Sequence, residues 1–163
     1  MDFEFSQDEQ RFLRDVDAFL EANHDPRVMD PSRENLAQLV DTPERRAFMK
    51  KLTERGWIGI TWPKEYGGQG GRGVYEYLPQ LGKGTGVVGK TLIKVASEKL
   101  KQEFLPKILN SEIEFAIGYS EPSAGSDAAA MRLKAERRGE GWVLNGQKVF
   151  TTSAHFADWY WVG

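Results

Sequence analysis

The hydrophobic pattern of the chain changes once, near Ser111, and this change limits the folds that the sequence can adopt. Before it, apolar residues recur at the spacing of amphipathic helices. After it, short apolar runs alternate with turns rich in Gly, Pro, Asn and Ser, a pattern typical of antiparallel strands. We therefore predict an α+β chain, with an all-helical N-terminal domain at residues 1–111 and an incomplete antiparallel β domain at residues 112–163.

Helix-capping residues precede three of the apolar stretches in the first part. Ser6 and Glu9 have the spacing of a capping box, Thr42 precedes a proline at a first-turn position, and Ser97 is a third capping residue. The helices expected are residues 6–23, 33–40, 42–56, 87–95 and 97–109, with a bend or restart at Pro106 and a short helical or extended piece at 74–78.

The second part is expected to contain five short strands, at residues 113–119, 131–137, 142–144, 148–152 and 158–162. Asn145 followed by Gly146 is the signal for a type I′ hairpin turn, here between Val143 and Val149. The final apolar run, WYWVG, has no closing strand or polar end after it. We therefore expect that the sequence is truncated.

The loop between the first two of these strands has the composition of a site for a polar ligand. Ser120, Ser123 and Ser126 offer hydroxyls, and Gly125 allows a close approach of the backbone to an anion, for which phosphate is the natural candidate. Phe150 lies beside a pair of threonine hydroxyls in the returning strand, so it is a candidate for stacking on a planar ligand. The alternative is an ordinary strand, turn and strand without a ligand.

A glycine pattern elsewhere imitates a nucleotide-binding motif. Gly68, Gly70 and Gly73 match the G-x-G-x-x-G fingerprint of nicotinamide-binding domains, but no Asp or Glu stands at the downstream position that binds the ribose. A loop over or beside a site is the preferred interpretation.

Other catalytic and metal sites are not expected. Ser153, His155 and Asp158 lie within one short segment, and such neighbours rarely converge as a catalytic triad. Glu121 stands in a turn, where a carboxylate more often accepts backbone N–H bonds than acts as a base. With 2 histidines and no cysteine, the chain has too few ligands for a transition-metal site.

Charge and hydropathy exclude further classes of protein. The net charge is -2, from 22 basic and 24 acidic residues, and no basic stripe indicates nucleic-acid binding. The acidic N-terminus lacks the features of a secretion signal, and no apolar stretch reaches the length of a membrane span. We expect a cytoplasmic protein.

Several ordered motifs closely resemble the flavin-dependent acyl-CoA dehydrogenase family. The motifs are WPKEYGG at residues 62–68, EKLKQEFLPKIL at 98–109, YSEPSAGSD at 119–127, NGQKVFTT at 145–152 and ADWYWVG at 157–163. The resemblance implies a helical domain, a middle β domain and a C-terminal four-helix domain, with FAD between them and against a neighbouring subunit. This chain would cover the first domain and part of the second.

The resemblance also implies roles for residues of the first loop. Tyr119 and Ser120 would contact the flavin ring near its pyrimidine edge, through backbone and hydroxyl groups. Gly125 and Ser126 would lie on the phosphate side of the cofactor, and Ser126 would also contact the acyl-CoA.

Two residues of the returning segment complete the implied FAD site. Phe150 stands where the family commonly has a tryptophan packed against the isoalloxazine, and Thr152 matches a hydroxyl that bonds near flavin N5. The implied reaction removes an α proton and a β hydride from an acyl-CoA thioester and gives a trans-2-enoyl-CoA. The implied partners are acyl-CoA, an electron-accepting flavoprotein and further subunits in a homo- or hetero-oligomer.

The chain departs from the family pattern in two respects. The family's catalytic base comes from the C-terminal domain, so no residue here is assigned as catalytic. The stretch from Tyr75 to Leu81 is shorter than the family's usual helix, which affects the wall of the acyl pocket. The competing interpretation is a catalytically silent subunit or interaction module with the same fold.

Overall fold

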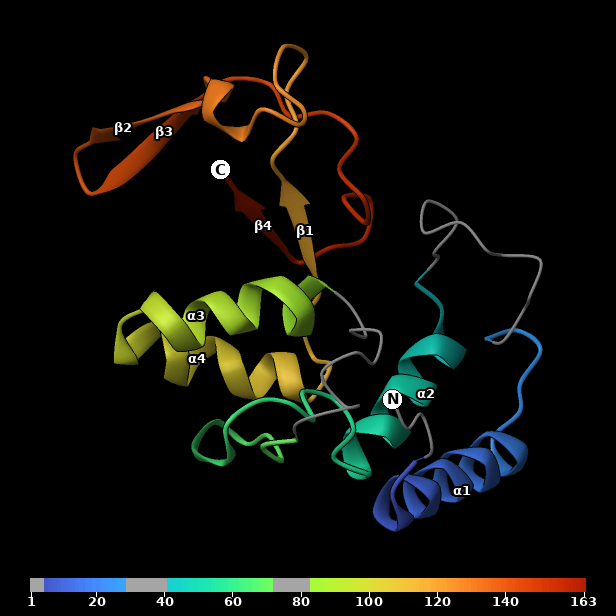
Figure 1. Ribbon diagram of the computed structural model, residues 1–163. Helices are drawn as coiled ribbons and strands as arrows, with labels where there is room; N and C mark the ends of the chain where they lie inside the picture. The colour runs from blue at the N-terminus through green and yellow to red at the C-terminus, as the bar shows by residue number, and fades with distance from the viewer. Residues whose placement is uncertain (1–4, 29–40, 72–82) are drawn as a thin grey trace.

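The computed structural model of the protein describes residues 5–28, 41–71 and 83–163. Helices occupy the first part and strands the second (Figure 1), so the predicted α+β class is confirmed. The helices are α1 (Gln7–Ala22), α2 (Pro43–Glu54), α3 (Gly89–Val95) and α4 (Glu98–Leu109). The strands are β1 (Phe115–Gly118), β2 (Lys134–Arg138), β3 (Gly141–Asn145) and β4 (Trp159–Val162).

Short helical turns complete the described elements. Single 3-10 turns lie at Lys64–Tyr66 and Ala128–Ala130, and a π-helical turn at Gly84–Val88 leads into α3. The helix expected at 33–40, the piece at 74–78 and the shortened stretch from Tyr75 to Leu81 lie outside the described residues, as does Gly73 of the glycine pattern.

The three predicted helix caps are present. The Ser6 hydroxyl accepts from the Glu9 backbone N–H at 3.3 Å, and the Glu9 carboxylate accepts from the Ser6 backbone N–H at 2.8 Å, which together make the capping box of α1. Thr42 caps α2 and Ser97 caps α4 in the same way, each accepting the N–H three residues on. The restart expected at Pro106 does not occur, because α4 continues to Leu109.

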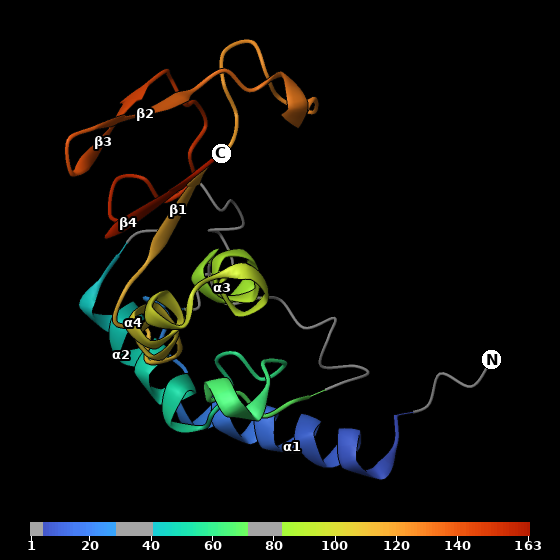
Figure 2. The same ribbon diagram turned by 90° about the vertical axis from the view of Figure 1, so that its left-hand side faces the viewer.

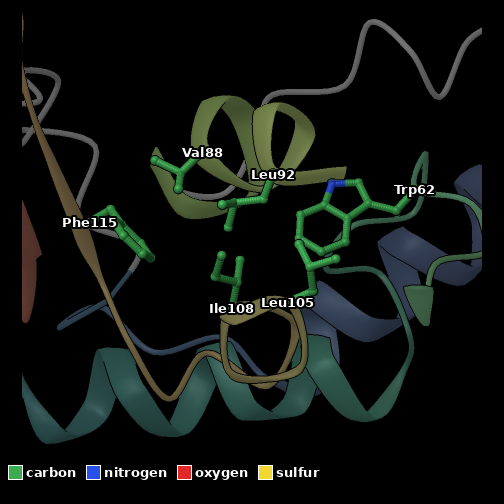
Figure 3. Packing of buried hydrophobic residues seen from close by; sticks show 6 residues of the cluster. All are labelled: Trp62, Val88, Leu92, Leu105, Ile108 and Phe115. Carbon is green, nitrogen blue, oxygen red and sulfur yellow. The ribbon is translucent and has the colours of Figure 1, made fainter. Parts of the chain in front are cut away.

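The main core lies between α3 and α4 and reaches into the first strand (Figure 3). Its buried residues are Trp62, Val88, Leu92, Leu105, Ile108 and Phe115. Trp62 crosses so close to α3 that a Cβ on Gly89 would lie 2.1 Å from the indole ring. Its indole N–H donates to the Thr85 carbonyl at 3.2 Å, which satisfies the buried polar atom. Because Phe115 opens β1, this core also anchors the β part.

A second, smaller core joins α1 and α2. Phe19, Leu52 and Ile58 are buried together, and the Phe19 ring meets Trp57 edge to face with a centroid distance of 5.0 Å. Leu109 at the end of α4 packs against both cores. The helical part is therefore one connected apolar structure.

The two strand pairs differ in direction. β2 and β3 form an antiparallel hairpin in the register Lys134↔Asn145 to Arg138↔Gly141, which agrees with the antiparallel direction expected for this part of the chain. β1 and β4 lie side by side in both views (Figures 1 and 2) but are parallel, with Phe115 opposite Trp159. The parallel pairing differs from the antiparallel expectation, because residues 119–158 form a long crossover that returns the chain to the start of β1.

Two local predictions in this crossover are wrong. The hairpin turn lies at Gly139 and Glu140, where Gly139 supplies φ 61°, whereas Asn145 pairs with Lys134 at the far end of the hairpin. Residues 148–152 form no strand, because Phe150 has a left-handed backbone with φ 55°, which interrupts an extended chain.

Candidate functional site

The crossover brings together the two segments that sequence reasoning selected. The Val149 N–H donates to the Ser120 carbonyl at 2.9 Å, and the Lys148 ammonium donates to the Tyr119 carbonyl at 3.1 Å. In Figure 1 the chain after β3 accordingly passes beside the loop that follows β1. Tyr119 and Ser120 thus lie next to the segment that carries Phe150.

The loop itself is closed by backbone hydrogen bonds. Glu121 and Ala124 exchange N–H to carbonyl bonds of 2.8 and 3.1 Å, and the Asp127 carboxylate accepts the Ala129 N–H at 3.2 Å to cap the following 3-10 turn. A Cβ added to Gly125 would meet nothing within 4 Å. Gly125 does not adopt a positive φ. Its absent side chain therefore leaves open space at the loop surface.

Three predicted hydroxyls are available to a ligand. Within the described segments, the side chains of Ser120, Ser126 and Thr152 have no hydrogen-bond partner. The neighbouring Thr151 is different, because its hydroxyl lies 2.6 Å from the Tyr160 hydroxyl. Serine and threonine hydroxyls both donate and accept, so each free one can bind a polar group.

Phe150 presents an aromatic surface that the described residues leave uncovered. Its side chain is 93% exposed, and its left-handed backbone costs a non-glycine residue roughly 1–2 kcal/mol. Exposed large apolar side chains in a strained conformation are candidates for ligand contact.

Tyr119 is fixed by the last strand. Its hydroxyl accepts from the Trp161 indole N–H at 3.0 Å, while its ring stays 43% exposed. Trp159 and Tyr160 are also about half exposed in the described structure. Tyr160 and Trp161 of β4 thus border the candidate site, through the hydroxyls of Thr151 and Tyr119.

Glu121 has the structural role that its turn position predicted. Its buried carboxylate accepts from the backbone N–H groups of Arg132 and Leu133 at 2.7 and 2.9 Å and from the Lys148 ammonium at 2.9 Å. The Lys148 hydrogen bond, followed by the two backbone bonds, lowers the pKa of Glu121 to about 2. A carboxylate that is ionised and fully bonded at neutral pH is unsuited to general acid-base catalysis.

Lys148 was missed by sequence reasoning. It lies 27 residues from Glu121, and the expected strand pattern gave no reason to place its side chain inside. The available signal was the Glu121 carboxylate, which stands in a turn before a proline. If such a carboxylate is buried, it needs hydrogen-bond donors or a cation beside it.

Asp158, in the segment that was considered for a catalytic triad, bonds to the backbone. The Asp158 carboxylate accepts the Glu114 N–H at 2.9 Å, so it serves the start of β1 rather than a triad with His155. The described residues contain no group of metal ligands, and none of their helices is long and apolar enough to cross a membrane.

Two cavities beside the helical part lie away from the candidate site residues. One of about 560 Å³ lies between the Lys64–Tyr66 turn and α4, and its lining includes Tyr66, Lys101 and Leu105. A smaller one of about 40 Å³ lies between α2 and β1, and its lining includes Arg45 and Glu114. Neither is lined by Tyr119, Ser120, Gly125, Ser126, Phe150 or Thr152.

Comparison with known proteins gives consistent results. The model of the acyl-CoA dehydrogenase N-terminal domain matches residues 6–112, and that of the acyl-CoA dehydrogenase middle domain matches residues 116–163. The acyl-CoA dehydrogenase FadE29 of Mycobacterium tuberculosis is 42% identical over 130 residues, which are 74% of this chain and 34% of the relative. The mitochondrial isovaleryl-CoA dehydrogenase of Pongo abelii is 34% identical over 93% of this chain and 38% of the relative.

Solved structures agree. The Tcur3481-Tcur3483 steroid ACAD superimposes with a TM-score of 0.82 at 35% identity, over 99% of this chain and 44% of that chain. The ChsE4-ChsE5 complex from Mycobacterium tuberculosis gives a TM-score of 0.82 at 29% identity, over 99% of this chain and 43% of that chain. The chain spans about a third of the length of the curated relatives that it matches. The chain belongs to the acyl-CoA dehydrogenase family.

Proposed function

We propose that this chain is part of an acyl-CoA dehydrogenase that converts an acyl-CoA thioester to a trans-2-enoyl-CoA, and that it carries part of the FAD and acyl-CoA site. Acyl-CoA dehydrogenases are FAD-dependent. The observation that carries the proposal is the contact between the Ser120 and Val149 backbones, which joins the two segments bearing the candidate residues. We also propose that residues 1–111 and 112–163 belong to separate domains of that enzyme.

The exposed groups of the candidate site fit a flavin nucleotide. The hydroxyls of Ser120, Ser126 and Thr152, which are free within the described segments, suit the polar edges of the ring and the phosphates, and the space beside Gly125 admits a bulky anionic group. Phe150 offers an uncovered aromatic face to a planar ring system. Bound FAD supplies the acceptor for the hydride that leaves the β carbon.

Each candidate residue then has a binding or orienting role. Tyr119 and Ser120 would hold the pyrimidine edge of the ring, and Gly125 and Ser126 would hold the phosphate side, where Ser126 would also contact the substrate. Phe150 would shield the ring from water, and the Thr152 hydroxyl would supply a hydrogen-bond donor to the ring. Hydrogen-bond donors placed where charge accumulates stabilise the reduced ring. No residue of this chain is proposed as the base that removes the α proton, and Glu121 is unsuited to that role because its carboxylate is ionised and already bonded.

The partners proposed for the enzyme are an electron-accepting flavoprotein and further subunits. One similar solved structure, which matches at 32% identity with a TM-score of 0.68, belongs to work on the electron transferring flavoprotein of Acidaminococcus fermentans. Another similar structure is that of the ChsE4-ChsE5 complex, which supports an oligomeric arrangement.

The purified full-length protein that contains this chain tests the proposal. We expect the absorbance bands of bound FAD, and we expect anaerobic acyl-CoA to bleach them. Flavin that stays oxidised with every acyl-CoA tested, or a protein that stays colourless after mixing with FAD, would overturn the enzymatic proposal. Either result would favour the catalytically silent subunit.

A further inference from the structure

One ion pair in the crossover differs from the others in the described segments. The Lys148 and Glu121 side chains are 4% and 5% exposed, whereas every other described pair has at least one side chain that is 22% exposed or more. Exposed pairs contribute little to stability, and a buried pair must offset the desolvation of both charges. A buried pair therefore needs either excellent bonding or a role beyond stability.

The bonding of this pair connects three separate parts of the chain. The Lys148 ammonium contacts the Glu121 carboxylate at 2.9 Å, the Tyr119 carbonyl at 3.1 Å and the Met131 sulfur at 3.6 Å. The Glu121 carboxylate in turn accepts the N–H groups of Arg132 and Leu133. The end of β1, the approach to β2 and the segment after β3 thus converge on two charged groups.

The same segments carry the proposed flavin contacts. Tyr119 and Ser120 directly precede Glu121, and Gly125 follows the turn that the Glu121 and Ala124 backbones close. Phe150 and Thr152 come two and four residues after Lys148. A shift of the ion pair would therefore move both sides of the site.

We propose that Glu121 and Lys148 are positioning residues that fix the two halves of the flavin site relative to each other. This inference rests on the proposed function. The pair acts through the backbones it holds: the ammonium anchors the Tyr119 carbonyl, and the carboxylate anchors the chain at Arg132 and Leu133. Supporting bonds of this kind set the precision of a binding site.

A purely structural role makes a different prediction. Removing one partner leaves a buried unpaired charge, which destabilises a fold, whereas replacing both partners with neutral groups is often tolerated. If the pair only stabilised the fold, the double variant would recover flavin binding along with stability. If it positions the site, the double variant recovers stability but not flavin binding, because the anchors on Tyr119, Arg132 and Leu133 are weakened or lost.

The test uses the full-length protein with Glu121→Gln, Lys148→Met and the combined double variant. The matched control is Glu136→Gln, which breaks the exposed pair with Arg138 on β2. Urea unfolding measures stability, titration of the deflavinated protein measures FAD affinity, and visible circular dichroism of the bound flavin reports its environment.

We expect the double variant to unfold close to the parent while its FAD dissociation constant rises about tenfold or more and its flavin dichroism changes. The Glu136→Gln control should retain the parent affinity and spectrum. A stable double variant with the parent's FAD affinity and dichroism would overturn the inference while leaving the proposed function intact. A parent protein that binds no FAD would overturn the proposed function itself, and the positioning role with it.

Discussion

Phe150 combines a left-handed backbone, with φ 55°, and a side chain that is 93% exposed. The backbone conformation costs roughly 1–2 kcal/mol, and an exposed phenylalanine recovers none of that by leaving water. The described part of the chain therefore gives Phe150 no stabilising role. A residue with this combination is a candidate for ligand contact.

The first prediction separates binding from stability at this residue. Phe150→Gly should weaken FAD binding by the full-length protein but change its free energy of unfolding by less than about 1 kcal/mol, because relief of backbone strain is offset by the greater entropy of the unfolded chain. Flavin titration and urea unfolding measure the two effects. Phe19→Ala is the contrasting control, since loss of this buried ring should cost about 3–5 kcal/mol. Unchanged FAD affinity in Phe150→Gly would contradict the proposed contact.

The second prediction concerns the pH dependence that Glu121 contributes. Its pKa falls from 4.5 to about 2 on folding, so its contribution to stability is present above pH 4.5 and is lost as the pH falls toward 2. Glu121→Gln should remove this part of the pH dependence. Urea unfolding of both proteins from pH 2 to 5 measures it, with Glu136→Gln as an exposed control. Parallel stability curves for Glu121→Gln and the parent would contradict the assignment.

At this scale, sequence reasoning predicted the kind of bond that Glu121 makes but not its partners. Glu121 accepts backbone N–H groups as expected, but the donors, Arg132 and Leu133, lie 11 and 12 residues along the chain rather than in its own turn. Lys148 could not be predicted as the ion-pair partner of Glu121, because the two residues lie 27 positions apart in the sequence. The assignments of Tyr119, Ser120 and Thr152 came from resemblance and stay predictions.

Among the elements, the helices followed from the sequence and the β pairing did not. Thr42 and Ser97 cap their helices with bonds that span three residues, so the signals are local. The parallel partnership of β1 with β4 depends on the course of residues 119–158. A single left-handed residue, Phe150, was enough to remove an expected strand.

The third prediction concerns the contact between α3 and Trp62. Alanine is favoured over glycine in a helix by about 1 kcal/mol. At Gly89, however, a Cβ would lie 2.1 Å from the Trp62 ring and 2.9 Å from the Gly84 carbonyl. We therefore expect Gly89→Ala to destabilise the chain by roughly 1–3 kcal/mol, because overpacking outweighs propensity.

Urea unfolding of Gly89→Ala and Gly125→Ala forms a matched comparison. Gly125 has open space around it, so its alanine variant should unfold within about 0.5 kcal/mol of the parent. A Gly89→Ala protein as stable as the parent would show that Trp62 can shift without cost, contrary to the close packing of this core.

At the scale of the whole molecule, the helical and β parts meet through apolar and charged contacts. Phe115 places the start of β1 in the core of α3 and α4. Beside it, the Arg45 guanidinium of α2 lies 3.7 Å from the Glu114 carboxylate, and the Asp158 carboxylate accepts the Glu114 N–H. The junction therefore contains a partly buried carboxylate close to the Arg45 guanidinium.

The fourth prediction follows from the burial of Glu114. Desolvation raises the pKa of its carboxyl group, and Arg45 offsets this only in part, while the Asp158 charge acts in the same direction as burial. Because the folded state holds the proton more tightly than the unfolded state, this contribution to stability is present below pH 4.5 and is lost as the pH rises through the raised pKa. Glu114→Gln should therefore gain stability relative to the parent as the pH rises above 4.5.

Urea unfolding at pH 4 to 8 measures the difference in stability between Glu114→Gln and the parent. This pH range lies above the range in which Glu121 titrates, so the two effects are separable. A Glu114→Gln protein that loses stability relative to the parent over this range would contradict the prediction. It would mean that the attraction between Glu114 and Arg45 is larger than the desolvation cost of the Glu114 carboxylate, so that this ion pair stabilises the junction of the two parts.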